Sequence, residues 1–335
     1  MKAFALSLFL SAVAMAAGPN FHITGKIEVG GDGGWDYVTV DSATQRLFLS
    51  RATRVIVVDL KAGKVAGEIP DTPGVHGVAL AHPFKKGFTS NGRENKVSVF
   101  DPATLQLIKK IDVGKGPDGI YYDEASKRVF TCNHGSTDIT AIDAATGEVA
   151  GTVKVGGAGE QMVTGRDGLL YVNLEDTAEV VAFDPKSLEV KHRFPIGVAK
   201  TPTGLAYDPK TNRLFIGCRE QPMMVVMDAG SGKVIANFPI GAGVDWAAFD
   251  AKDKLVLTSS GDGTMGIFHQ KSADEYEDAG ALKTQQSAKT MAFDPKTGKI
   301  YLPAAEYTTT PGGDPTKKQS RTMKPGSFVV LIASK

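Results

Sequence analysis

The sequence contains few cysteines and tryptophans and, after its first residues, no long apolar segment. Its 335 residues include 2 cysteines and 2 tryptophans. No C-x-x-C-H motif is present, which excludes covalent attachment of a c-type haem. Cys132 and Cys218 lie far apart in the sequence, at the ends of short apolar segments, so we expect two buried free thiols. After the N-terminal region, no apolar run is long enough to span a membrane as a helix.

A strong excess of charge of one sign is also absent. Lys and Arg number 38 and Asp and Glu number 37, which leaves a net charge of +1. Without a large net positive charge, the protein has no long-range electrostatic attraction to nucleic acid or to acidic lipid. We therefore do not expect a nucleic-acid partner. The signatures G-x-S-x-G and H-E-x-x-H are missing too, so the chain carries neither of the corresponding hydrolase sites.

The N-terminus has the pattern of a secretory signal. Lys2 precedes an apolar run over residues 3–14, and Ala14 and Ala16 fit a small-residue cleavage site. We therefore predict a signal peptide at residues 1–16 and a single domain over residues 17–335. This pattern predicts a periplasmic or secreted bacterial protein.

The body of the chain repeats a unit that is clearest in residues 117–156. The unit contains four short runs of β-branched, aromatic and other apolar residues, which are separated by turns rich in Gly, Asp and Ser: 120–122, 129–132, 139–142 and 149–155. Such runs are typical of strands, and no segment has the sustained period of a helix. Each unit is therefore expected to be a four-stranded sheet.

Seven of these units follow one another at a spacing of about 42 residues. Their opening runs are DYVTVD at 36–41, HGVALA at 76–81, DGIYYD at 118–123, QMVTGR at 161–166, TGLAYD at 203–208, DWAAFD at 245–250 and KTMAFD at 289–294. This spacing predicts an all-β fold, a seven-bladed β-propeller of four-stranded blades.

The seventh unit ends before its fourth strand. The missing strand is expected at the other end of the chain, because ITGKIEVGG at 23–31 matches the fourth strand LIKKIDVGK at 107–115. The N-terminal strand should complete the last blade and close the ring.

The repeated motif resembles that of a known family. The sequence VGKGPDGIYYD at 113–123, RVF at 128–130 and IDAATGEV at 142–149 is similar to the YncE-like (YVTN-repeat) seven-bladed propellers of exported bacterial proteins. The resemblance covers residues 23–334 and implies a periplasmic binding or scaffold protein. Related propellers include DNA-binding, redox-partner and lactonase proteins and the heavy chains of quinone-dependent amine dehydrogenases. No catalytic residue can be transferred, since the motifs specify strands and turns.

One face of the propeller collects the candidate functional residues. In a meander, the linker before the first strand lies on the same face as the loop between the second and third strands, and we call this the linker face. The residue before each first strand is polar: Asp36, His76, Asp118, Gln161, Thr203, Asp245 and Lys289. Loops on this face add further charged side chains, among them Glu175 and Arg219. These residues could converge on one ligand, or each could hydrogen-bond backbone near its own strand.

The sector of units six, seven and one holds the predicted ligand site, because both tryptophans fall there beside cations. The predicted ligand-binding residues are Trp35, Asp36, Tyr37, Arg51, Arg54, Asp245, Trp246, Lys289 and Tyr307. Aromatic side chains beside cations suit anionic or flat ligands, although both tryptophans could also be buried inside the sheets. The loop over residues 303–327 is longer than its counterparts and is either a lid or contact loop or an irregular excursion.

A metal site is a second possibility on this face. His76, Asp118 and His134 offer two imidazoles and a carboxylate, which suit zinc or iron, but their spacing matches no established ligand motif.

These observations favour a non-enzymatic propeller, expected to be a monomer, that binds a small molecule or a periplasmic protein. One alternative is a metal-assisted hydrolase of the lactonase or lyase type, with His76 or His134 as general base. Another is a single-stranded DNA binder that uses the loop cations Lys317, Lys318, Arg321 and Lys324.

Overall fold

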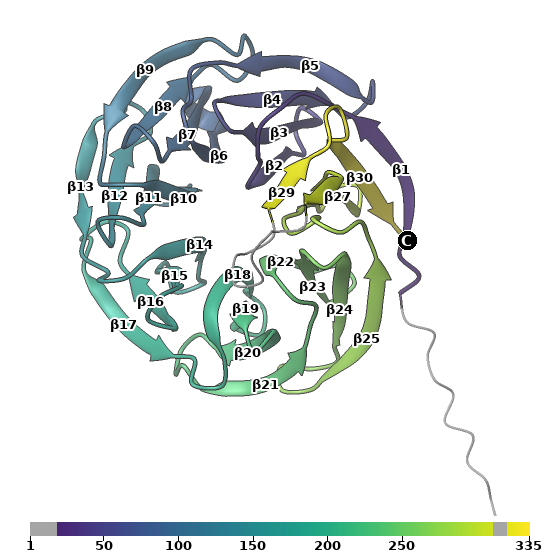
Figure 1. Cartoon of the computed structure of the whole chain (residues 1–335). Helices are drawn as coiled ribbons and strands as arrows, with labels where there is room; N and C mark the ends of the chain where they lie inside the picture. Colours follow the sequence, from purple (N-terminus) through teal and green to yellow (C-terminus); the bar gives the residue numbers. More distant parts are fainter. Residues whose placement is uncertain (1–18, 311–319) are drawn as a thin grey trace, which may run out of the picture.

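The structure, a computed structural model, describes residues 19–310 and 320–335. Within these residues, seven four-stranded antiparallel sheets follow one another around a central axis (Figure 1). The predicted seven-bladed β-propeller is thus confirmed. The predicted signal peptide at 1–16 lies outside the described residues and stays a prediction.

The first four blades consist of consecutive strands. Blade one contains β2 (Val38–Asp41), β3 (Arg46–Arg51), β4 (Arg54–Asp59) and β5 (Lys64–Ile69). Blade two contains β6 (Val75–Ala81), β7 (Lys86–Asn91), β8 (Lys96–Phe100) and β9 (Leu107–Asp112). Blade three contains β10 (Pro117–Asp123), β11 (Arg128–Asn133), β12 (Asp138–Asp143) and β13 (Val149–Val153). Blade four contains β14 (Gly159–Thr164), β15 (Leu170–Leu174), β16 (Glu179–Phe183) and β17 (Val190–Pro195).

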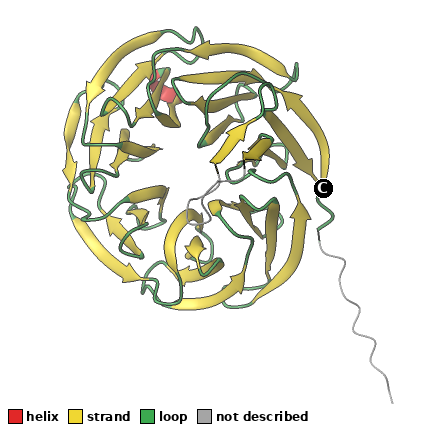
Figure 2. Cartoon of the chain, in the orientation of Figure 1, coloured by secondary structure: helices red, strands yellow, loops and turns green. Residues whose placement is uncertain are grey.

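The next two blades repeat this order, and the last blade combines both ends of the chain. Blade five contains β18 (Lys200–Asp208), β19 (Arg213–Glu220), β20 (Met223–Asp228) and β21 (Val234–Pro239). Blade six contains β22 (Val244–Asp250), β23 (Leu255–Ser260), β24 (Thr264–Gln270) and β25 (Tyr276–Lys283). Blade seven contains β26 (Ala292–Asp294), β27 (Lys299–Ala304), β30 (Val329–Ser334) and β1 (His22–Glu28). In the described part of the chain, helix is limited to the 3-10 turn η1 (His82–Phe84), and Figure 2 shows how little it contributes.

The hydrophobic core lies between neighbouring blades. The second and third strands are buried over most of their length because a blade packs on each of their faces, whereas the fourth strands are largely exposed at the rim. Between blades three and four, for example, the rings of Phe130 and Phe183 pack edge to face with centroids 5.5 Å apart. Cys132 and Cys218 are buried free thiols within such layers, as expected.

Aspartates at strand ends form the tight turns between strands. Asp143 Oδ1 accepts hydrogen bonds from the backbone N–H groups of Ala145 (2.9 Å) and Thr146 (2.8 Å), and Gly147 follows at a φ of 70°. The positive φ favours glycine there, because a Cβ atom makes this conformation costly.

The N-terminal strand completes blade seven. β1 pairs with β30 in antiparallel register from His22↔Ser334 to Glu28↔Val329, so the two ends of the propeller lie side by side (Figure 1). A second contact joins blades seven and one near the ends of their first strands, where Asp294 accepts hydrogen bonds from Ser42 and Gln45.

The long loop predicted at 303–327 contains a hairpin of β28 (Tyr307–Thr310) and β29 (Ser320–Met323). Tyr307 and Met323 of this hairpin pack against the hydrophobic cluster shared by blades seven and one. The hairpin is therefore anchored to the closing sector of the ring, and a role as a lid stays a prediction. Among the described residues, no helix is both long and apolar enough to cross a membrane.

Candidate functional site

The polar residues predicted to precede the first strands meet around the central axis on the linker face. Asp36 and Lys289 do precede β2 and β26, whereas the other five lie at the start of their first strands. Of the seven predicted positions, five have a charged partner in this ring: Asp36, His76, Asp118, Asp245 and Lys289. The other two bond backbone of neighbouring blades. Gln161 Oε1 accepts a hydrogen bond from the N–H of Leu205 (2.8 Å), and Thr203 Oγ1 donates one to the carbonyl oxygen of Val244 (2.8 Å).

Lys289 joins the first strands of blades six, seven and one. Its Nζ lies 3.1 Å from Asp36 Oδ1 and also contacts Asp245 Oδ2. Burial alone would lower the pKa of Lys289, but the charges of Asp36 and Asp245 outweigh it and raise that pKa. Lys289 is therefore a charged ammonium group that neutralises two largely buried carboxylates.

The ion-pair chain continues on both sides of Lys289. Towards blade five, Arg219 contacts Asp245 with Nη2 and lies 3.1 Å from Glu175 Oε1 with Nη1. Towards blade two, His76 Nδ1 donates a hydrogen bond of 2.7 Å to Asp36 Oδ2. The signs of the groups alternate along this part of the ring, which we call the paired arc: Glu175, Arg219, Asp245, Lys289, Asp36 and His76.

The pKa values follow from this pairing. Burial opposes ionisation of Asp36, but the hydrogen bond from His76 and the charge of Lys289 lower the pKa of this carboxyl. Burial would likewise lower the pKa of His76, whereas the carboxylates of Asp36 and Asp118 raise it. Each charge in the paired arc is thus stabilised by a neighbour of opposite sign.

Asp118, His134 and Glu160 interrupt the alternation between blades three and four, and we call these residues the acidic arc. Glu160 is 7% exposed and accepts a hydrogen bond from Tyr37 Oη at Oε2 (2.6 Å). Its Oε1 lies 3.9 Å from His134 Nδ1. Asp118 Oδ1 is buried and has no hydrogen-bond partner among the described atoms.

Burial of two carboxylic acids in one place changes their pKa values. Burial raises the pKa of Asp118 to about 6. Burial and the nearby charge of Asp118 also raise the pKa of Glu160 well above its usual range. His76 Nδ1 lies 3.6 Å from Asp118 Oδ1, but among the described residues no Lys or Arg pairs with either acid, so the acidic arc has less compensating charge than the paired arc.

Two overlapping sets of residues have the geometry to hold a metal ion. One set is Asp36, His76 and Asp118, and the other is Asp118, His134 and Glu160. Within each set, one ligand atom from each residue lies within 4.8 Å of the others. The predicted metal residues His76, Asp118 and His134 are thus neighbours, but they divide between two sets that share Asp118.

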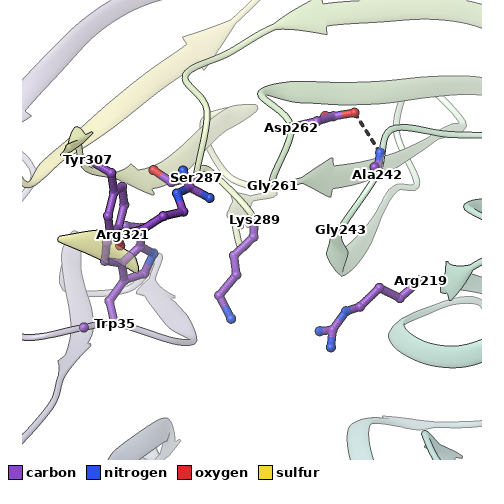
Figure 3. Close-up of a pocket in the computed structure, with 11 residues that line it drawn as sticks. Trp35, Arg219, Ala242, Gly243, Gly261, Asp262, Ser287, Lys289, Tyr307 and Arg321 are labelled. Atoms are coloured by element: carbon purple, nitrogen blue, oxygen red, sulfur yellow. Dashed lines mark hydrogen bonds between the residues drawn. The ribbon is translucent and has the colours of Figure 1, made fainter. Parts of the chain in front are cut away.

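A cavity of about 670 Å³ lies beside the paired arc, towards the hairpin. Figure 3 shows Lys289 and Arg219 pointing into the same open space, with Trp35, Tyr307 and Arg321 grouped on one side of it. The rings of Trp35 and Tyr307 are 6.4 Å apart, and the Arg321 guanidinium lies 4.9 Å from the Tyr307 ring centroid. This cavity combines an aromatic wall with basic groups.

Two further cavities adjoin the ring. One of about 670 Å³ shares Trp35 and Lys289 with the first cavity and extends to His76, Asp118 and His134. The other, of about 310 Å³, is lined by Tyr37 and Trp246, whose rings pack 5.2 Å apart, and by Glu160. The two tryptophans therefore line different cavities.

The predicted arginines of unit one have structural contacts. Arg51 is fully buried, donates hydrogen bonds to the carbonyl oxygens of Gly31 (2.8 Å) and Gly33, and stacks 3.8 Å above the Phe328 ring. Arg54 lies 3.4 Å from Glu68 on the rim strand β5. Among the described residues, neither arginine lines the three cavities. Ligand binding by either arginine stays a prediction.

Glu160 is the functional candidate that the sequence prediction missed. It stands one position before Gln161, where the other units have Trp35, Val75, Pro117, Pro202, Val244 and Ala288. A charged residue at a position that is apolar in the other six units was the sequence signal that could have identified it. A register shift between Gly159 and Met162 accommodates both Glu160 and Gln161 at the start of β14.

Comparison with known proteins agrees with this architecture. The sequence profile of the YNCE-like beta-propeller family matches residues 79–295. The chain is 26% identical to the protein YncE of Salmonella typhi over 245 residues, which span 66% of this chain and 67% of that protein. It is 25% identical, with the same coverage, to YncE of Salmonella typhimurium.

A solved structure shares the fold at lower identity. A chain of hydrazine synthase from Kuenenia stuttgartiensis superposes with a TM-score of 0.71 and 18% identity, over 84% of this chain and 95% of that chain. At this identity the similarity shows the propeller fold alone.

Proposed function

Because the chain belongs to the YncE-like β-propeller family, we propose that it is an exported, non-enzymatic protein that binds a small molecule or a protein partner on the linker face. The main support is the cavity of about 670 Å³ beside Trp35, Tyr307 and Lys289. Its volume falls in the range of about 300–1,000 Å³ that is usual for small-molecule sites.

The lining of this cavity suits a flat molecule that carries an anionic group. Trp35 and Tyr307 offer aromatic surface for a ring, and Arg321 already stacks on Tyr307. Lys289 and Arg219 point into the same space (Figure 3) and can donate hydrogen bonds to a carboxylate or phosphate group. A small molecule is therefore preferred to a protein as the first ligand to test.

Tryptophan fluorescence tests this proposal directly, because Trp35 and Trp246 are the 2 tryptophans of the chain. Trp246→Phe leaves Trp35 as the single reporter beside the cavity. We expect aromatic carboxylates or nucleotides from a defined panel to change the fluorescence of this variant. Arg321→Ala should then weaken binding about tenfold, the loss expected for one charged contact.

Lys61→Ala provides the matched control, since it removes an exposed cation from the turn between β4 and β5, on the opposite face. It should leave the affinity unchanged. If no compound in the panel perturbs Trp35, or if Arg321→Ala binds as tightly as Lys61→Ala, the ligand site is misplaced.

A metal-assisted hydrolase of the lactonase or lyase type is the second candidate function, and the two metal-compatible sets of residues favour it. In that case His76, held by its hydrogen bond to Asp36, or His134 would act as general base. Hydrolysis of a lactone panel that stops on chelation would support this function, whereas equal rates with and without chelator would oppose it. Single-stranded DNA has less support, because the five carboxyl groups around the axis leave no excess of positive charge there for its phosphates.

A further inference from the structure

We propose that Asp118, His134 and Glu160 bind a divalent transition-metal ion, such as zinc, between blades three and four. This site lies on the acidic arc and is separate from the cavity beside Trp35 and Tyr307. The proposal therefore holds or fails independently of the proposed small-molecule ligand.

The first argument is the hydrogen bonding of the ligand atoms. Asp118 Oδ1 is buried and has no hydrogen-bond partner among the described atoms. Glu160 Oε1 has His134 Nδ1 as a neighbour at 3.9 Å, which is beyond hydrogen-bonding distance. His76 Nδ1 lies 3.6 Å from Asp118 Oδ1, which is also beyond hydrogen-bonding distance. The three residues thus bring their ligand atoms together without hydrogen bonds to one another.

The second argument is distance. In a tetrahedral zinc site the ligand atoms lie about 2.0–2.2 Å from the metal, and hence roughly 3.3–3.6 Å from one another. The ligand atoms of Asp118, His134 and Glu160 all lie within 4.8 Å of one another. The side chain of His134 is 44% exposed, so a small rotation of this imidazole can complete the geometry.

The third argument is charge. In the paired arc, Lys289 and Arg219 each contact two carboxylates. In the part of the chain that the structure describes, no Lys or Arg forms an ion pair with Asp118 or Glu160. His76 Nδ1 lies 3.6 Å from Asp118 and also pairs with Asp36, so a divalent cation would add positive charge beside the partly buried Asp118 and the buried Glu160.

The fourth argument is orientation. Tyr37 Oη donates a hydrogen bond of 2.6 Å to Glu160 Oε2, which holds the carboxylate and leaves Oε1 directed to His134. Metal ligands in proteins are commonly fixed by outer-shell hydrogen bonds of this kind. A mixed imidazole and carboxylate donor set suits zinc and neighbouring first-row ions.

The alternative set, Asp36, His76 and Asp118, is less suited to a metal. His76 Nδ1 already donates a hydrogen bond of 2.7 Å to Asp36, and Asp36 also pairs with Lys289. A metal bound to this set would have to break these contacts. The acidic arc can bind an ion without losing an ion pair to Lys or Arg.

The test uses zinc itself as the probe. The chain from residue 17 is treated with a chelator, dialysed, titrated with zinc chloride by calorimetry, and examined by elemental analysis after a second dialysis. We expect one bound ion per chain. Glu160→Gln and His134→Ala should each weaken zinc binding at least tenfold, with unchanged circular dichroism and thermal unfolding in the absence of metal.

Two control variants separate ligation from general electrostatics. His82→Ala removes an exposed histidine in η1, which contacts Asp41 on the opposite face, and should bind zinc as the unmodified chain does. Glu175→Gln removes a neighbouring carboxylate outside the proposed ligand set, so it should change the affinity less than threefold.

Three outcomes would overturn the proposal. The first is no zinc retained after dialysis and no heat of binding at millimolar zinc. The second is equal weakening by Glu175→Gln and Glu160→Gln, since the effect would then be one of net charge alone. The third is loss of binding in His76→Ala but not in His134→Ala, which would place the ion among Asp36, His76 and Asp118.

Discussion

The joint between blades seven and one differs from the joint between blades three and four. At the first joint the chain passes from β1 of blade seven to β2 of blade one, but β1 is held in its blade only by pairing with β30, the other end of the chain. Asp294 with Ser42 and Lys289 with Asp36 add contacts between the two blades. At the second joint both blades consist of consecutive strands, and the partly buried Asp118 and the buried Glu160 lie close together near the axis.

This difference shows where the propeller needs favourable polar contacts. Blades three and four each consist of consecutive strands, so they stay adjacent even with two carboxyl groups between them. The linker from β1 to β2 secures the closing joint only while β1 stays paired with β30, so strand pairing, hydrogen bonds and an ion pair must hold that joint. Carboxyl groups without a Lys or Arg partner are therefore better tolerated between blades three and four, where they are available for binding a cation.

The largest effect should come from removing the closing strand. A chain that lacks residues 17–29 loses β1, including the buried side chain of Ile27, and leaves the edge of β30 unpaired. Deletion of one buried isoleucine side chain alone costs about 2–5 kcal/mol, so the free energy of unfolding should fall by more than about 4 kcal/mol. Urea unfolding measures it, with a chain that lacks only residues 17–20 as control. An unchanged melting temperature after the longer deletion would contradict the assigned role of β1.

A smaller effect should follow from changing single charges at the two joints. Lys289→Ala leaves Asp36 and Asp245 without their shared cation, and the free energy of unfolding should fall by about 2–4 kcal/mol. Glu160→Gln removes a carboxyl group whose ionisation is opposed by burial and by Asp118, so the stability should stay equal or rise by up to ~1 kcal/mol. Urea unfolding with a chelator present compares the two variants. An equal loss of free energy of unfolding in Lys289→Ala and Glu160→Gln would show that the two joints do not differ in their need for paired charges.

The smallest effect concerns the pH dependence of the closing joint. Burial would raise the pKa of Asp294, but hydrogen bonds from Ser42, Thr297 and Gln45 outweigh it and lower the pKa below the ordinary 3.8. A carboxyl whose pKa is lower in the folded state stabilises the protein above about pH 4 and loses this contribution as the pH falls through the folded value.

Asp294→Asn should therefore cost about 1 kcal/mol at pH 7 and make stability less dependent on pH below 4. Urea unfolding at pH 7 and pH 3 measures both effects. Asp112→Asn, which removes an exposed carboxylate from β9, is the control. If Asp294→Asn lost as much stability between pH 7 and pH 3 as Asp112→Asn does, the proposed role of Asp294 at the joint would be contradicted.

The fold could be predicted from sequence because the repeat determines it. Runs such as DGIYYD at 118–123 recur at nearly constant spacing, and the match of residues 23–31 to 107–115 identified the strand that closes the ring. Spacing and strand patterns survive sequence divergence because each blade must bury the same two faces. The polar residue at or just before the start of each first strand followed from the same repeat.

The site was only partly predictable because contacts across the axis leave no trace in sequence spacing. Lys289 and Asp36 were expected in one sector, and the structure brings them within 3.1 Å. Arg51 could not be recognised as a buried residue, since its partners are backbone carbonyls of a glycine-rich linker. Glu160 was missed because the repeat marks only the next position as polar, and blade four is the one blade with a charged residue at the preceding, otherwise apolar position.

The pairing of β1 with β30 also has a consequence for biosynthesis. β1 leaves the ribosome before any blade is made, and its partner leaves after all the others. Each inner blade can form from neighbouring segments, but the ring can close only once β30 has been made. A chain interrupted before β30 would expose an unpaired strand at each end, which marks it for proteolysis or aggregation. Closure by the most distant pair of strands thus depends on synthesis having passed β30.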